Sequence, residues 1–241
     1  MSDNREGVTL HEPRLIICEG ITDAAFFTSL IEARSLNPFQ IISIGHLHNV
    51  GGISGGGIDA LPDALRYIRV LPDFSKTVRN IAIVADSDGG QADDFAKITG
   101  YIKKANKHDD VKDLFPIPEE PFKKKQESKL SMTVLMLPGD NSSGAIESLL
   151  WKSLERRHVI KAKCVQEMIK CAKIVEGSEP NQWSKTKIDK AQVNAILAIL
   201  YRKNPAIPLW NLWGRQQTAD LVPLGFKEHE FDAIASHLSA I

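Results

Sequence analysis

The chain has 241 residues, and its 30 lysines and arginines balance 30 aspartates and glutamates, so the formal net charge is zero. A bulk electrostatic attraction to nucleic acid is therefore excluded, and any phosphate binding must come from local basic clusters. No apolar run approaches the ~20 residues that a membrane span requires, and the segment 1–12 lacks the apolar core of a signal peptide.

Short apolar strands alternate with helical patterns through most of the chain. Brief apolar runs bounded by turn residues predict strands, and apolar residues three and four positions apart predict helices. The expected strands are 15–18, 39–44, 81–85 and 132–137, and the expected helices are 23–35, 61–71, 91–107 and 145–157. Loops are expected over the glycine-rich segment 45–57 and over 109–129. This order predicts an α/β domain over 1–157, with a mostly parallel four-stranded sheet flanked by helices.

Only helical patterns follow residue 158. Helices are expected over 165–175, 188–201 and 227–238, and we interpret 158–241 as a helical extension packed on the sheet domain. Cys164 and Cys171 are two helical turns apart and are expected to be buried core thiols. Together with Cys18 they make three cysteines, a sparse and odd number that favours a reducing cytoplasm over a disulfide framework.

Acidic residues end two of the expected strands. Glu19 follows 15–18 and precedes Gly20, and Asp86 and Asp88 follow 81–85. Ligands of open parallel sheets bind at the carboxyl ends of strands, near the point where the strand order reverses. If these strands are neighbours, three carboxylates meet in one crevice, where like charges raise one another's pKa or recruit a cation. Mg²⁺ is typically held by one or two carboxylates, with room left for water and phosphate, so a Mg²⁺ or Mn²⁺ site is expected.

A Glu-Gly at one strand end, an Asp-x-Asp at a later one and the helices between them resemble the TOPRIM domain. That domain is shared by topoisomerases, bacterial-type primases, OLD-family nucleases and small RNA-maturation nucleases. Over 15–151 the chain is most similar to the TOPRIM domain of OLD-family nucleases. The resemblance implies a Rossmannoid TOPRIM fold, a metal bound by Glu19, Asp86 and Asp88, and a proton-transfer role for Glu19.

The OLD-like resemblance implies three further residues. Asp23 matches a Glu-x-x-x-Asp spacing from Glu19, and Glu147 follows the fourth expected strand, where an acid of OLD-like nucleases helps to bind the metal pair. A downstream lysine of these nucleases neutralises charge at the scissile phosphate. Lys190 is the candidate for that catalytic role, and Lys187 is the runner-up.

Each acid also has a purely structural interpretation. Asp23 and Glu147 lie in the first turns of expected helices, where an acid complements the helix dipole or takes part in a cap. The Asp86–Asp88 segment could form an Asx-type turn into the next helix. These alternatives remain open at the level of the sequence.

Basic clusters usually form solvated faces, and some of those in this chain are expected to contact phosphates. The clusters comprise Lys103, Lys104 and Lys107; Lys123, Lys124 and Lys125; Arg156, Arg157, Lys161 and Lys163; and Lys185, Lys187 and Lys190. The expected function is a metal-dependent phosphodiester hydrolase, a nuclease that acts on DNA or RNA with salt-dependent binding. The alternative is a non-catalytic TOPRIM-fold recruitment module in a nucleic-acid-processing complex. A protein partner or a homo-oligomer is compatible with either function.

Overall fold

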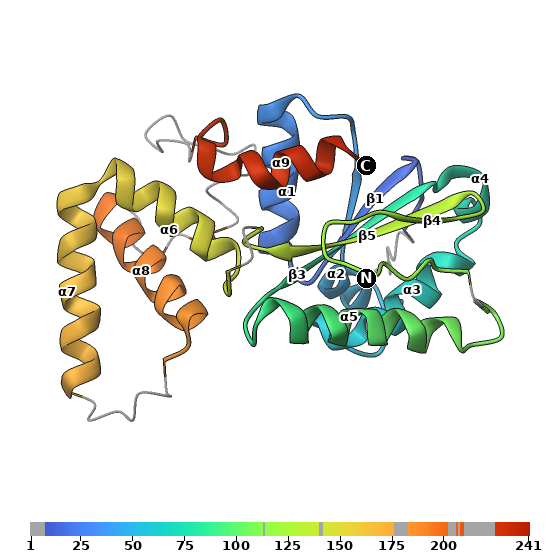
Figure 1. Cartoon of the computed structure of the whole chain (residues 1–241), viewed down its shortest axis with the longest axis horizontal. Coiled ribbons are helices and arrows are strands. Elements are labelled where there is room, and N and C mark those ends of the chain that lie inside the picture. The colour runs from blue at the N-terminus through green and yellow to red at the C-terminus, as the bar shows by residue number, and fades with distance from the viewer. Residues whose placement is uncertain are drawn as a thin grey trace, which may run out of the picture.

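A five-stranded sheet lies between two layers of helices in the computed structural model (Figure 1). The structure describes residues 8–112, 114–139, 142–175, 183–201, 206, 208–209 and 225–241. The strands are β1 (Arg14–Cys18), β2 (Gln40–Ser43), β3 (Asn80–Asp86), β4 (Lys125–Glu127) and β5 (Leu130–Leu137), in the spatial order β2-β1-β3-β5-β4. Pairing is parallel among β2, β1, β3 and β5, whereas β4 is antiparallel to β5. The predicted α/β class and the mostly parallel sheet are confirmed.

The strand count of four was wrong, because β4 lies inside the segment expected to be a loop. Its sequence is Lys-Gln-Glu, and its side chains are exposed or half-buried at the sheet edge, so no apolar pattern announces it. It forms a hairpin with β5 through a turn in which Ser128 has a φ of 53°. Backbone pairing with β5 therefore creates this strand without a hydrophobic face.

The expected helices are all present, and two short helices were not expected. The longer ones are α1 (Ile21–Arg34), α3 (Leu61–Val70), α5 (Gln91–Asn106), α6 (Ile146–Arg157), α7 (Val159–Val175), α8 (Lys185–Leu200) and α9 (Asp232–Ser239). Of these, α7 begins six residues before the expected position 165, and α9 begins five residues after the expected position 227. The two unexpected helices are α2 (Ile44–Asn49) and α4 (Phe74–Thr77), with 3-10 turns at Ile58–Ala60 and His229–Phe231. The expected loop over 45–57 thus begins as a helix, because Ser43 caps α2 by accepting a hydrogen bond from the His46 N–H at 3.1 Å.

Alternate strand residues contribute to two separate cores, as the period of two in a strand requires. Leu15 and Ile17 of β1 pack in a core with residues of α2, α3 and α5. Ile16 and Cys18 pack on the opposite face in a core that includes residues of α1, α6, α7, α8 and α9. Figure 1 shows α1 and α9 on one side of the sheet and α3 and α5 on the other. The sheet is thus covered on both faces.

The helices after Arg157 share the second of these cores with the sheet. Figure 1 shows α6, α7 and α8 grouped beyond one end of the sheet, and α9 lies against α1. The Phe26 ring of α1 contacts Phe226 and Phe231, with ring centroids 5.4 and 5.9 Å apart. Among the described residues, no helix is both long enough and apolar enough to span a membrane.

Two sequence expectations about the helical part need correction. Cys164 and Cys171 are exposed on α7 rather than buried, because the inward side of α7 is formed by Ala162, Val165 and Ile169. Part of the basic cluster around Arg156 is neutralised within the fold. The Arg156 guanidinium pairs with Glu228 and Glu230 at 2.7 Å each and joins α6 to the segment before α9.

Candidate functional site

The strand order reverses between β1 and β3. From β1 the chain forms β2 on one side of β1 and then returns to form β3 on the other side. Glu19 follows β1 directly, and Asp86 is the last residue of β3. Ile17 is paired with Ile83, and Glu19 and Asp86 follow these paired residues by two and three positions. The two acidic strand ends therefore meet at the position where ligands of such sheets bind.

The segment after β3 is joined to the loop that begins α6. Ser87 is fully buried, and its N–H donates to the Gly144 carbonyl at 2.8 Å, while the Gly144 N–H donates back at 3.1 Å. Alternation along this extended segment directs Asp86 and Asp88 away from buried Ser87. The same bridge brings the first turn of α6, which carries Glu147, to the end of β3.

Gly144 is required by this bridge. Its φ is +151°, and a Cβ atom added there would lie 2.2 Å from the Ser148 Oγ and 2.9 Å from the Ser148 Cβ. Ser148 itself caps α6, because its Oγ accepts a hydrogen bond from the Ala145 N–H at 3.2 Å. The hydrogen bond that caps the Ala145 N–H at the start of α6 thus comes from Ser148.

Asp23 has a structural role at the start of α1. Its Oδ2 accepts a hydrogen bond from the N–H of Gly20, the N-cap residue, at 2.9 Å. Burial raises the pKa of Asp23 from 3.8 to about 6, against the lowering effect of the Gly20 N–H, and the charges of Glu19 and Glu147 raise it further. Asp23 therefore caps the helix and also belongs to the acidic cluster.

Burial strongly perturbs the pKa of Asp86. Burial raises its pKa from 3.8 to about 8, and the charges of Asp23, Glu147 and Asp88 add to the increase, whereas Lys190 opposes it. Burial also raises the pKa of Glu147, again against Lys190 and with a contribution from Asp88. Titratable groups with such shifts are concentrated at functional sites.

Lys190 contacts the acidic cluster electrostatically from α8. Burial alone would lower the pKa of its ammonium group, but the attraction of Glu147, Asp86, Asp88 and Glu19 raises it above its ordinary value. The structure thus brings together Glu19, Asp23, Asp86, Asp88, Glu147 and Lys190, the six residues proposed from the sequence. Their chemical roles remain predictions.

Sequence reasoning missed two polar residues of α8. The Thr186 hydroxyl donates a hydrogen bond to Asp88, and it lies four residues before Lys190 on the same helix face. Buried Asp189 accepts hydrogen bonds from Ser148 of α6 and from Lys185. The i, i+4 spacing of Thr186 and Lys190 was a signal in the sequence, but it has meaning only once α8 is known to lie beside the strand ends.

The donor set is that of a hard divalent cation. Within the described part of the chain, no three acidic, histidine or cysteine side chains lie close enough together to form a metal-ligand group as they stand. Mg²⁺, however, is commonly held by only one or two carboxylates, with water and phosphate completing the octahedron. Burial and then mutual repulsion raise the pKa of Asp86 and Asp23, and a bound cation relieves the repulsion. The residues present therefore fit Mg²⁺ or Mn²⁺.

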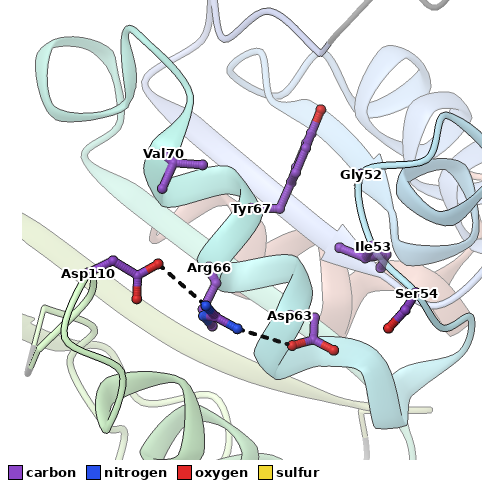
Figure 2. Close-up of a pocket in the computed structure, with 8 residues that line it drawn as sticks. All are labelled: Gly52, Ile53, Ser54, Asp63, Arg66, Tyr67, Val70 and Asp110. Carbon is purple, nitrogen blue, oxygen red and sulfur yellow. Dashed lines mark ion pairs between the residues drawn. The ribbon is translucent and has the colours of Figure 1, made fainter.

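A cavity of about 340 Å³, whose lining includes none of the six site residues, lies on the α3 side of the sheet (Figure 2). Its lining includes Gly52, Tyr67 and Arg66, and the Arg66 guanidinium is 3.7 Å from both Asp63 and Asp110. These two carboxylates already offset the positive charge of Arg66. This cavity therefore adds no unpaired cation for phosphate binding, and the chemistry is concentrated at the strand ends.

Comparison with known proteins gives one match. Residues 13–220 match the model of a family described as "Protein of unknown function (DUF3226)". No curated protein and no solved structure matches the chain. The matched span begins one residue before β1 and extends beyond α8, so it includes all six site residues. Because this match covers most of the chain, the protein belongs to the DUF3226 family.

Proposed function

We propose that this protein is a metal-dependent phosphodiester hydrolase, a nuclease that acts on DNA or RNA, on a TOPRIM-like fold. The observation that carries the proposal is the convergence of five carboxylates and Lys190 at the reversal of strand order. The Glu-Gly and Asp-x-Asp strand ends on neighbouring parallel strands support the TOPRIM-like assignment. The family match carries no chemical information, so the proposal rests on the site.

The acids divide into two groups by position. Asp86, Asp88 and Glu147 come from β3, the residues after it and α6, and one or two of these carboxylates would hold Mg²⁺ or Mn²⁺, with water and phosphate as further ligands and Asp23 assisting. When bound, the metal polarises the phosphate and lowers the pKa of the attacking water. Glu19 is exposed beside them, where its carboxylate can accept the proton of that water or return one to the leaving oxygen.

Lys190 supplies positive charge on the side of the site formed by α8. Its ammonium group is attracted to all five carboxylates, yet a single positive charge cannot neutralise them all. A bound cation completes that neutralisation, and Lys190 is then able to stabilise charge that develops on the scissile phosphate. Lys187 lies one turn earlier on α8 and is exposed.

Thermal unfolding and hydrolysis test this proposal together. The melting temperature is measured with and without Mg²⁺ or Mn²⁺, for the wild type, for Asp86→Asn and for the surface control Asp109→Asn. A ligand that binds only the native state stabilises it by about 2.7 kcal/mol at 100 times its Kd. We therefore expect metal to stabilise the wild type and Asp109→Asn clearly more than Asp86→Asn.

Hydrolysis is followed on labelled single-stranded DNA, double-stranded DNA and RNA, in Mg²⁺, in Mn²⁺ and in a chelator. The proposal requires cleavage that depends on metal and is lost in Asp86→Asn. Equal cleavage in the chelator contradicts it. Nucleic-acid binding without cleavage in either metal would favour the non-catalytic recruitment module.

A further inference from the structure

A cavity of about 350 Å³ adjoins the carboxylate site on the side of α8. It lies among the first turn of α1, α6, α8 and the residues Ala206, Pro208 and Leu209. Its lining includes Thr22, Glu147, Asn194, Leu197, Pro208 and Leu209. We propose that this cavity binds one unpaired nucleobase of the substrate, next to the scissile phosphate, an inference that rests on the proposed nuclease function.

One face of α8 connects the carboxylate site to the cavity. Thr186, Lys190 and Asn194 follow one another at intervals of four residues, and Leu197 comes three residues later. Residues at these intervals lie on the same side of a helix, and four residues advance about 6 Å along its axis. Thr186 bonds to Asp88, Lys190 is attracted to the acids, and Asn194 and Leu197 line the cavity. The cavity is therefore about one nucleotide away from the phosphate position.

The lining suits an uncharged ring better than a phosphate. Leu197, Pro208 and Leu209 provide apolar surface, and Thr22 and Asn194 provide hydrogen-bonding groups. The Asn194 amide offers both donors and an acceptor to the edge of a base. Among the described residues that line the cavity, Glu147 is the charged one, and its carboxylate would repel a phosphate.

The size of the cavity limits the substrate. Its volume of about 350 Å³ is near the lower end of the roughly 300–1,000 Å³ that is usual for ligand pockets, which leaves room for one base. A base can enter only after it has left its stack and its partner, which has a cost in duplex nucleic acid. We therefore expect single strands and unpaired ends to be preferred over intact duplex.

An abasic strand, which has the sugar phosphates but no bases, shows how much the base contributes to turnover. The value of kcat/KM in Mn²⁺ is measured on a single strand of DNA, a single strand of RNA and an abasic strand of equal length. Hydrogen bonds from Thr22 and Asn194 to the edge of a base are worth about tenfold in binding, so the wild type should prefer a base-bearing strand by about that factor. A preference in either the DNA or the RNA arm supports the inference.

Asn194→Trp fills the cavity from an exposed position of α8. We expect the ratio of base-bearing to abasic turnover to fall about tenfold, towards unity. Ile199→Trp is the matched control, because Ile199 is 38% exposed on the same helix and is not among the lining residues; it should keep the wild-type ratio. Asn194→Ala removes only the amide and should lower the ratio by less, which keeps the test valid if the Trp variant does not fold.

The outcomes separate this inference from the proposed function. If the wild type cleaves base-bearing and abasic strands equally, or if the ratio is unchanged in the Asn194 variants, the base site is refuted and the nuclease proposal stands. If the wild type cleaves none of the strands with metal present, both are refuted.

Discussion

Removal of the Asp86 charge should stabilise the metal-free protein, and increasingly so as the pH rises. Burial and the neighbouring acids raise the pKa of Asp86 from 3.8 to about 8 in the folded state. A carboxyl whose folded pKa is raised contributes stability that is complete below pH 3.8 and is lost as the pH rises through about 8. Each pKa unit corresponds to about 1.4 kcal/mol, so the loss has an upper limit of about 5 kcal/mol at pH 8.

The variant Asp86→Asn keeps the shape of the side chain and cannot ionise. It should therefore match the wild type near pH 4 and exceed its unfolding free energy by about 2–5 kcal/mol at pH 8, in a chelator. Urea unfolding at pH 5, 6.5 and 8 measures this difference as a shift of the unfolding midpoint. The slope of the unfolding free energy against urea concentration should be the same for both proteins. Asp23 also has a raised pKa and is repelled by the same acids. The increase in unfolding free energy of Asp86→Asn therefore includes the weaker repulsion of Asp23.

Asp109→Asn is the control, since Asp109 is an exposed acid after α5. It should show the same pH dependence as the wild type. A stability difference between Asp86→Asn and the wild type that is the same at pH 5 and pH 8 would refute the reasoning. It would mean that Asp86 is ionised throughout this range and that the acids do not form a repelling cluster.

Three further substitutions test single parts of the site. Glu19→Gln should lower turnover by about 100-fold or more with little change in nucleic-acid affinity, and a loss of affinity with turnover of bound substrate intact would assign Glu19 to docking instead. Lys190→Met should lower kcat, and without metal its unfolding free energy should fall more steeply with rising pH than that of the wild type. Lys187→Met should have neither effect. Equal effects of the two variants would show that Lys190 has no special role in the site. Gly144→Ala forces a Cβ against Ser148 and should cost about 1–3 kcal/mol in urea unfolding, so wild-type stability would show that the loop can rearrange.

Local patterns in the sequence determined most of the elements and the chemical types of the site. Strands such as β1 and β3 are short apolar runs, and Glu19 and Asp86 end them, which is visible without any knowledge of the fold. The helical period likewise predicted α1, α5 and α6. These features depend on residues a few positions apart, and the sequence displays such relations directly.

The tertiary structure alone decided which of these parts meet. The adjacency of β1 and β3, the bridge from Ser87 to Gly144 and the position of α8 beside the strand ends join residues up to 171 positions apart, from Glu19 to Lys190. It also decided that β4 exists and that Cys164 is exposed. Backbone pairing at a sheet edge and the choice of which helix face turns inward depend on partners far away in the chain, and a local pattern carries no record of those partners.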